Sequence, residues 1–289
     1  MRRLRAVWAL GGVLATAMVV AAASAPAAVA GCDRGCLMTA LDRYIDRAAA
    51  QDFTALALSK GAETRENTLA TRPDAGVWKT LKRVRAGYRF ADPVTGNAVF
   101  AGVFERRDGG LTPLLLRIRL KNRVVVESEI AWNTTPGRYF HPEELLYPDI
   151  LYEAVVPAAR RSTRAELIRI AGLYLDGIGA HSSAGVPLGY RCDKYYLGGK
   201  VTNNGPDGVG SCLTSFDGVR AGSPVGRRFP IVDVERGIVV VSFLMPNAYK
   251  DRPDATYECE ILKVVDGRIR SFEEFGNSSA WPPDSGFKQ

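Results

Sequence analysis

The heptapeptide Leu41-Asp42-Arg43-Tyr44-Ile45-Asp46-Arg47 has a counterpart in Ala171-Gly172-Leu173-Tyr174-Leu175-Asp176-Gly177, 130 positions further along the chain. In both stretches apolar residues recur at three- and four-residue spacing, which predicts an amphipathic helix. Tyr44 of the first helix therefore corresponds to Tyr174 of the second. A repeat of this kind predicts a chain built from two similar halves.

Two further matches follow in the same order. Each half has a turn that leads into a strand, at residues 88–104 and 228–243, and then two strand-like runs separated by a short turn, at 114–132 and 257–275. The last turn contains Asp266-Gly267, a pair that favours a two-residue β-hairpin. The shared order of helix, strand and hairpin predicts an α+β fold with two domains of one type.

The domain boundaries follow from these matches. We expect a signal peptide at 1–30, a first domain at 31–133, a connector at 134–159 and a second domain at 160–289. The connector is marked by prolines, which interrupt regular structure: Pro136, Pro142, Pro148 and Pro157.

The beginning of the chain has the composition of an export signal. Three arginines within the first five residues precede an apolar run at 6–23, and the small residues Ala28-Val29-Ala30 follow. This charged, apolar and small-residue order is typical of a secretory signal peptide. A membrane-spanning helix would be the alternative, but the alanine-rich run is at the short limit for crossing a bilayer. We therefore expect cleavage after Ala30 and a soluble exported product.

A lipid anchor is a second alternative. Val29-Ala30-Gly31-Cys32 also resembles the lipobox of bacterial lipoproteins, in which the cysteine becomes the lipidated first residue. Contact with a membrane is expected only in that case, through Cys32.

Export implies an oxidising compartment in which thiols pair. The chain has five cysteines, so one is left over. Cys192 and Cys212 flank a glycine-rich loop and are predicted to form a disulfide. The pairing of Cys32, Cys36 and Cys259 stays open, with Cys259 favoured as the free thiol. No histidine lies near a cysteine in the sequence and the glycine-rich loop lacks the spacing of a phosphate loop, so we predict no metal site and no cofactor.

The charge of the chain argues against one class of partner. Removing the leader, which holds three arginines and no acidic residue, lowers the formal charge from +7 to +4. The densest basic runs, 79–85 and 160–164, contain no interleaved aromatic residues. We interpret them as solvated surface and expect no nucleic-acid partner.

At this point the sequence resembles a known superfamily. A first helix with Arg43-Tyr44-Ile45-Asp46, Asp52 after it, Thr64-Arg65-Glu66-Asn67 and a hairpin that runs into a long last strand resemble the NTF2-like or SnoaL-like proteins. The stretches 32–37, 76–78 and 231–237 are similar to a family of secreted proteins of unknown function that has such domains in tandem. The resemblance implies two tandem cone domains, each a curved antiparallel sheet packed on helices around an apolar pocket. Enzymes and binding proteins share this fold, so the fold does not decide the function.

The resemblance also implies candidate site residues in the first domain. Tyr44 stands where the ketosteroid isomerases of the superfamily place a tyrosine that hydrogen-bonds a developing oxyanion. The position of their catalytic carboxylate falls on Asn67, an amide that cannot accept the proton, so Glu66 is the candidate base. Asn67 and Trp78, together with Tyr44, would form a recognition set for a polar ligand with a flat face. The alternative is that Tyr44 and Trp78 are core residues and that Glu66-Asn67 is a turn.

The second domain departs from the family pattern. The resemblance predicts an acidic residue and an asparagine shortly after Cys192, but the chain has Tyr196 and Leu197 there. Asp233 and Glu235, expected on one face of a strand, remain as candidate ligand-binding residues. The alternative for them is a salt-bridged end of a strand.

The sequence therefore predicts an exported protein that binds a small organic ligand. The alternative is a lyase, isomerase or hydrolase that uses a tyrosine and a carboxylate as an acid–base pair in the same pocket. A third hypothesis is an assembly module, and the oligomeric state stays open.

Overall fold

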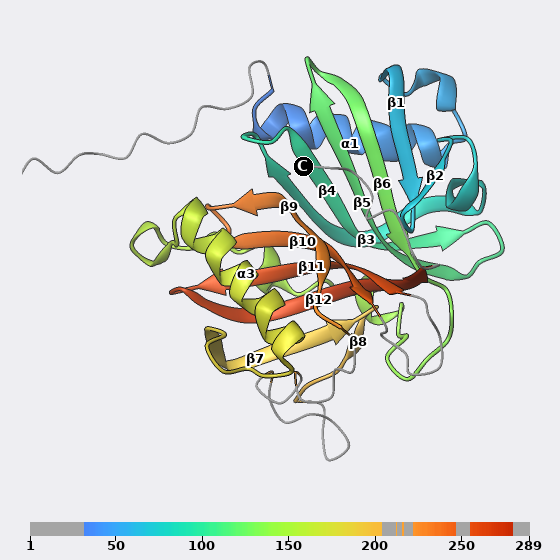
Figure 1. Cartoon of the computed structure of the whole chain (residues 1–289). Helices are drawn as coiled ribbons and strands as arrows, with labels where there is room; N and C mark the ends of the chain where they lie inside the picture. Colours follow the sequence, from blue (N-terminus) through green and yellow to red (C-terminus); the bar gives the residue numbers. More distant parts are fainter. Residues whose placement is uncertain (1–31, 204–211, 213–215, 217–221, 247–254, 280–289) are drawn as a thin grey trace, which may run out of the picture.

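The computed structural model describes residues 32–203, 212, 216, 222–246 and 255–279, so the predicted signal peptide lies outside the described residues. Each half of the chain forms one six-stranded sheet with one long helix (Figure 1). The first half consists of α1 (Arg34–Ala49), η1 (Phe53–Ala55), β1 (Leu58–Glu66), β2 (Leu69–Thr71), η2 (Gly76–Lys79), β3 (Leu81–Asp92), β4 (Asn97–Arg106), β5 (Leu111–Lys121) and β6 (Val124–Trp132). The connector holds η3 (Glu144–Leu146), α2 (Ile150–Glu153) and η4 (Ala158–Arg160). The second half consists of α3 (Arg164–Ala180), β7 (Leu188–Tyr196), β8 (Gly199–Lys200), β9 (Val225–Asp233), β10 (Ile238–Pro246), β11 (Ala255–Val265) and β12 (Arg268–Ser279).

The two sheets have the same strand order. It is β2-β1-β6-β5-β4-β3 in the first half and β8-β7-β12-β11-β10-β9 in the second. In each sheet the first long strand pairs in parallel with the last one, β1 with β6 and β7 with β12, while the other neighbours are antiparallel. The chain is therefore a structural repeat, and its sheets are mixed rather than antiparallel as expected.

The expected α+β class is wrong, because the described chain is mostly β. Nearly half of the described residues lie in strands, and the described part of the chain has three α-helices, of which α2 is a single turn. The helix-like periodicity of the sequence is confined to α1 and α3, and each of these covers one face of one sheet. The opposite faces pack on each other and on the connector, so no second helical layer is present in the described residues. The architecture does not confirm the NTF2-like assignment.

The two long helices begin with capping side chains. Asp33 accepts a hydrogen bond from the backbone N–H of Cys36 at the start of α1. At the start of α3, Thr163 and Glu166 form a reciprocal capping box. Each helix then places buried residues at three- and four-residue intervals against its sheet.

A third apolar core lies between the two sheets. Alternate residues of one strand face different cores: Phe100 of β4 packs against α1, whereas Val99 and Ala101 face the second sheet. Strands buried on both faces explain the continuous apolar runs in β4 and β10.

Two reciprocal ion pairs join the halves. Arg34, at the start of α1, contacts Asp233 at the end of β9 (2.6 Å), and Arg164, at the start of α3, contacts Asp92 at the end of β3 (2.8 Å). The helix start of each half thus binds a strand end of the other half, and the two halves pack as a pseudo-symmetric pair.

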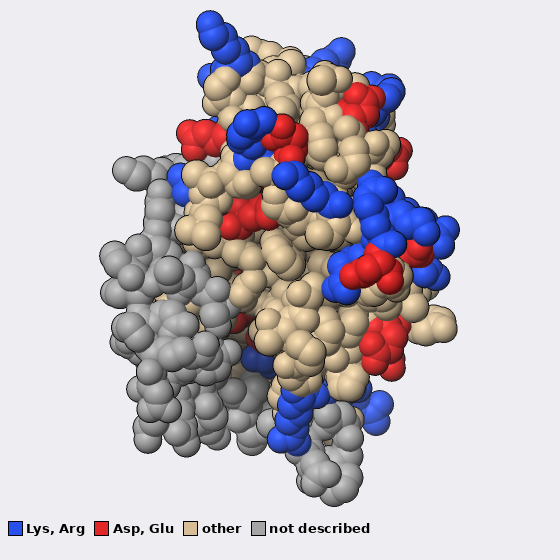
Figure 2. Space-filling model, turned by 90° about the vertical axis from the view of Figure 1, so that its right-hand side faces the viewer, with Lys and Arg blue, Asp and Glu red and all other residues tan. Residues whose placement is uncertain are grey.

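Charged side chains of both signs mix on the surface. On the face shown in Figure 2, lysine and arginine side chains lie beside aspartate and glutamate side chains. Within the basic run at 79–85, Lys82, Arg83 and Arg85 all contact Glu105.

Candidate functional site

A groove of about 700 Å³ lies where the connector crosses the second sheet. Its walls come from β3, the connector, the β7–β8 turn and β12. We call it the connector groove, and define it by the residues that line it: Tyr88, Arg138, Tyr139, His141, Glu144, Leu145, Tyr147, Pro148, Asp149, Tyr152, Tyr195, Gly198, Gly199, Lys200 and Glu273.

Tyrosines dominate this groove. The chain has 11 tyrosines, and five of them line it: Tyr88, Tyr139, Tyr147, Tyr152 and Tyr195. They range from the fully buried Tyr152 to Tyr147, which is 82% exposed at the rim. A tyrosine ring offers a flat apolar face and one hydroxyl, which suits it to contact a ligand that is both apolar and polar.

One carboxyl group lies at the bottom of the groove. Glu273 of β12 is 4% exposed and accepts a hydrogen bond from the backbone N–H of Gly198 (3.2 Å). Burial, together with the nearby carboxylates of Glu274 and Asp149, raises the pKa of Glu273 to about 8. The carboxyl is therefore mainly protonated at neutral pH, so it can donate a hydrogen bond as well as accept one.

The turn beside Glu273 depends on glycine. Gly198 has a φ of +87°, and a Cβ atom there would collide with the backbone carbonyl of His141. Only glycine lets the β7–β8 turn and the connector approach so closely. The same backbone supplies the N–H that Glu273 binds.

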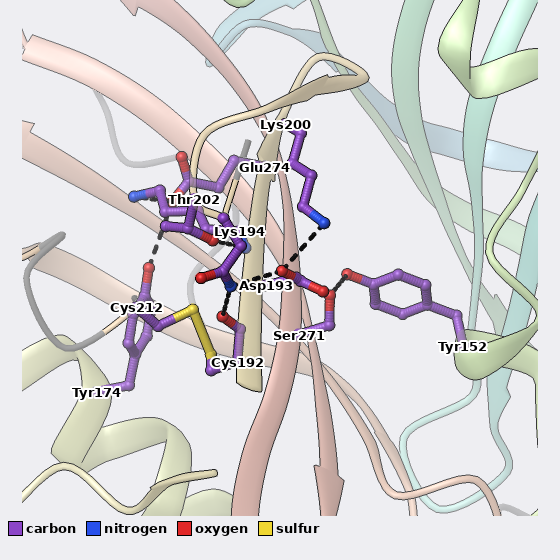
Figure 3. The surroundings of a disulfide bond; sticks show 11 residues. Tyr152, Tyr174, Cys192, Asp193, Lys194, Lys200, Thr202, Cys212, Ser271 and Glu274 are labelled. Carbon is purple, nitrogen blue, oxygen red and sulfur yellow. Dashed lines mark hydrogen bonds and ion pairs between the residues drawn. A yellow bond between two sulfur atoms is a disulfide. The ribbon is translucent and has the colours of Figure 1, made fainter. Parts of the chain in front are cut away.

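Hydroxyl groups surround the carboxyl. The Tyr152 hydroxyl bonds to Ser271 Oγ (2.8 Å), as Figure 3 shows, and the Tyr88 hydroxyl accepts from the backbone N–H of Asp149 (2.7 Å). Burial raises the pKa of both phenols, and it raises the pKa of Tyr195 to about 12. All three remain protonated and able to hydrogen-bond a ligand.

Basic groups lie at the rim, where they have partners in the chain. Lys200 contacts Asp193 (3.2 Å), and its Nζ lies 5.7 Å from the centre of the Tyr195 ring. His141 lies 3.2 Å from Glu143 and from the carbonyl of Arg138. The groove thus combines aromatic walls with mixed charge at its opening.

The repeat supplies an internal comparison for Glu273. Glu129 of β6 occupies the same ladder position in the first sheet, where its neighbours are Arg65 and Arg117. The neighbours of Glu273 are Tyr195 and Ile261. An aromatic and an aliphatic side chain thus stand where the first half has two arginines.

The two carboxyls also differ in charge, because Glu129 has arginine partners from both halves of the chain. Glu129 contacts Arg117 (2.9 Å), Arg228 (2.6 Å) and the Tyr257 hydroxyl (2.6 Å). Burial raises the pKa of Glu129, but the guanidinium groups of Arg228 and Arg117 outweigh it and hold this pKa at about 2. Within the described residues Glu273 has no arginine or lysine ion pair. The same sheet position is a closed ion cluster in one half and an uncharged acid at a groove in the other.

The predicted residues of the first domain lie in and around its core. Tyr44 and Trp78 are buried with ring centres 6.1 Å apart, and burial raises the pKa of Tyr44 to about 12. The Glu66 carboxylate accepts the backbone N–H of Val77 (3.0 Å), and burial raises its pKa. None of these residues lines the connector groove.

Asn67 has backbone partners on both sides of its amide. It donates to the carbonyl of Trp132 (3.2 Å) and accepts from the N–H of the same residue (3.0 Å). The role assigned to Tyr44, Glu66, Asn67 and Trp78 in ligand binding or catalysis stays a prediction.

Asp233 and Glu235 are separated by the fold. Asp233 is buried and contacts Arg34 (2.6 Å) and Arg236 (3.7 Å). β9 ends at Asp233, so Glu235 lies in the following turn, half exposed and 3.9 Å from Arg236. We expected the two side chains on one face of a strand, but only Asp233 belongs to a strand.

One feature of the sequence does indicate the burial of Glu273. Phe272-Glu273-Glu274-Phe275 places two adjacent carboxyls inside a strand with aromatic residues on both sides. Adjacent residues of a strand point to opposite faces, so if both faces are buried both carboxyls must be buried too.

The disulfides indicate the compartment. Cys192 pairs with Cys212 (Figure 3) and Cys32 with Cys36, while Cys259 is a buried free thiol between the sheets. Two disulfides indicate an extracellular or extracytoplasmic location. Within the described ranges, no helix has the length and apolar character needed to span a membrane.

One known family matches part of the chain. Residues 160–276 match the family described as "Domain of unknown function (DUF8021)". No curated protein matches the chain. A solved structure, described as a protein from Sphaerobacter thermophilus, is 13% identical, with a TM-score of 0.28, over 33% of this chain and 94% of that one. This likeness is too low to support any conclusion about fold or function.

Proposed function

We propose that this chain is an exported protein that binds a small organic ligand in the connector groove. The observation that carries the proposal is the concentration of five tyrosines around the buried, uncharged carboxyl of Glu273. The groove volume of about 700 Å³ falls within the range of small-molecule sites.

The lining favours an uncharged ligand that carries hydroxyl groups on flat faces, such as a mono- or disaccharide. Tyrosine rings can stack on the C–H faces of such a ligand, and the phenols and Glu273 can hydrogen-bond its hydroxyls. The rim carries both Lys200 and Asp149, so its electrostatics do not select for strongly anionic or cationic ligands.

Two exposed tyrosines provide a matched test of this site. Tyr147 (82% exposed) lies at the groove, whereas Tyr190 (86% exposed) of β7 is not part of its lining. A saccharide library is screened against the mature protein by ligand-observed NMR, and any hit is titrated against Tyr147→Ala and Tyr190→Ala. We expect Tyr147→Ala to weaken binding about tenfold, since one aromatic contact contributes about 1 kcal/mol or more, and Tyr190→Ala to leave it unchanged. Silence of the whole library, or equal effects of the two substitutions, would overturn the proposal.

Export is supported by the leader-like sequence at 1–30 and by the two disulfides. In the structure the Cys32 sulfur is bonded to Cys36, and a lipidated cysteine could not form that bond. We therefore favour a soluble product over a lipid-anchored one. Mass spectrometry of the mature N-terminus tests this choice, and a diacylated Cys32 would reverse it.

An acid–base enzyme is the second candidate, because the pKa of Glu273 lies near neutrality. A carboxyl with a pKa of about 8, beside the phenols of Tyr88 and Tyr152, could transfer a proton in a lyase, isomerase or hydrolase reaction. If the protein turns over a bound ligand, Glu273→Gln should abolish turnover and keep binding. A bound ligand that the wild-type protein leaves unchanged would exclude this candidate for that ligand.

A further inference from the structure

A second buried polar cluster lies on the other face of the second sheet, between the sheet and α3. It comprises Glu258 and Glu260 of β11, Glu274 of β12, Lys194 of β7 and Tyr174 of α3. Beside it is a small cavity of about 40 Å³, whose apolar wall is formed by Ile178, Phe216 and Met245. We call this the α3 cavity.

Two of the three carboxyls have partners. The Tyr174 hydroxyl donates to Glu260 (2.5 Å). Lys194 contacts Glu274 (2.6 Å), and Figure 3 shows both of these residues near Tyr174. Glu258 is 3% exposed, and within the described chain its Oε2 has no hydrogen-bond partner. Its carboxylate lies over Gly276, on the same face of β12 as Glu274, because a Cβ at Gly276 would collide with it.

The cluster has more acid than base. Burial and the neighbouring carboxylates raise the pKa of Glu258 and of Glu260 well above the usual range. The other side chains that face them are Lys194, Glu274, Tyr174 and, from β10, the uncharged Val241 and Phe243. Because the single lysine is held by Glu274, Glu258 and Glu260 keep their protons when no other cation is present.

The fold does not require these charges. The ladder positions of Glu260 and Glu274 are occupied in the first half by Leu116 and Ile130, and that of Glu258 by Leu114. All three are buried against α1. The first half therefore shows that an apolar interior satisfies this architecture.

We propose that this cluster binds a primary ammonium group on a short alkyl chain, with the chain in the α3 cavity against Phe216 and Met245. The nitrogen lies at Glu260, which lines the cavity with Tyr174, Lys194 and Glu274, and beside Glu258, which lies two residues along the same strand, outside the lining. The site is separate from the connector groove. The ring of Tyr174 packs against Phe216 and Phe272 (centres 5.7 and 5.1 Å away), and aromatic faces stabilise a nearby cation. The cavity has room for a group of very few atoms, in keeping with an ammonium head.

An organic cation fits this cluster better than a metal ion does. Among the described residues, no three acidic, histidine or cysteine side chains are arranged to hold a metal. An ammonium group offers several N–H donors, and the cluster offers the unpartnered Glu258 oxygen as one acceptor.

The test is calorimetric titration of the mature protein with n-propylammonium chloride, with n-propanol as the uncharged control of the same length. If the cation replaces a proton on the cluster, binding releases up to one proton and the association constant rises with pH. We expect no binding of propanol. Equal binding of the two probes, binding without proton release, or no binding of propylammonium would each overturn the proposal.

Substitutions locate the site. Glu258→Gln and Glu260→Gln should each weaken propylammonium binding about tenfold or more and reduce the proton release, while Glu235→Gln, an exposed acid in a turn, should change neither. Thermal unfolding checks that each variant is folded. Unchanged binding by both folded cluster variants would place any bound cation elsewhere and overturn the assignment.

Discussion

In the first half Leu114, Leu116 and Ile130 face α1, whereas the same ladder positions of the second half bring Glu258, Glu260 and Glu274 against α3. On the opposite face of each sheet, away from the long helix, the matched residues are both acidic but differ in their partners. Glu129 of the first half is neutralised by Arg117 of its own sheet and by Arg228 of β9, whereas its counterpart Glu273 has no arginine ion pair among the described residues.

The comparison separates what the fold needs from what it tolerates. One strand order is compatible with an apolar interior and with a charged one, so the buried acids of the second half are not required for folding. Buried carboxyls without a cation lower stability. Polar groups kept at such a cost are expected at functional sites, and both proposed sites lie in or against the second half.

The largest expected effect comes from removing an ion-pair partner of Glu129, the buried carboxylate that is held by two arginines. Arg228→Ala removes two hydrogen bonds from the buried Glu129, and we expect a loss of about 4 kcal/mol in the free energy of unfolding in urea. Because the folded pKa of Glu129 is about 2, this stability is present above the unfolded value near 4.5 and is lost as the pH falls toward 2. The control Arg119→Ala removes an exposed pair with Glu127 and should change stability by less than about 1 kcal/mol. Similar effects of the two substitutions would contradict the prediction.

For the uncharged carboxyl of Glu273 we expect stability to depend on pH in the opposite direction. Since the folded pKa of Glu273 is about 8, the folded state binds more protons than the unfolded state between pH 4.5 and 8. Its contribution is fully present below pH 4.5 and is lost as the pH rises through 8. We expect Glu273→Gln to flatten this decline by on the order of 3 kcal/mol, allowing for relaxation around the buried group. Denaturant unfolding at pH 5, 6.5 and 8 gives the free energy of unfolding of both proteins. An equal decline with pH in the wild type and the variant would disprove the prediction.

The disulfides differ between the halves in the length of chain they close. Cys192 and Cys212 are 20 positions apart, and Cys32 and Cys36 are 4 apart. Chain entropy predicts a loss of about 3 kcal/mol for the paired Cys192→Ser and Cys212→Ser substitutions, and about 2 kcal/mol for Cys32→Ser and Cys36→Ser. Chemical denaturation of both double variants gives the comparison. A larger loss from the short loop would reverse the order.

The smallest effect is expected at the pseudo-symmetric ion pairs. Arg164→Ala removes two hydrogen bonds from the buried Asp92, whereas Arg34→Ala removes one from Asp233, which also contacts Arg236. We expect losses of about 2 and about 1 kcal/mol respectively, because each substitution takes a partly exposed arginine from a buried aspartate and only Asp233 keeps a second arginine nearby. The melting temperatures of both variants test this prediction. Equal decreases in melting temperature would contradict the larger effect expected for Arg164→Ala.

Local patterns in the sequence predicted the local structure. The helical spacing around Tyr44 and Tyr174 marked α1 and α3, and Asp266-Gly267 marked a turn in which both residues have positive φ. The parallel pairing of β1 with β6 could not be predicted in this way, because it joins residues about sixty positions apart.

The candidate site escaped prediction for a related physical reason. Charged residues in a strand usually indicate a solvated face, but β12 is covered by α3 on one side and by the connector on the other. Glu273 and Glu274 are therefore both buried, on opposite faces. The burial of the two carboxyls depends on the packing of segments that are distant in the sequence, so a local sequence pattern alone could not predict it.

The reciprocal contacts of Arg34 with Asp233 and of Arg164 with Asp92 carry a consequence for the origin of the chain. In a two-fold symmetric homodimer, a contact from residue i to residue j occurs twice, once in each direction. The two ion pairs have this isologous form, and they join matched positions of the repeat. This is the arrangement expected if a gene for a dimeric ancestor was duplicated and fused. Fusion would then have let one copy acquire acids that a true homodimer would have had to accept in both subunits.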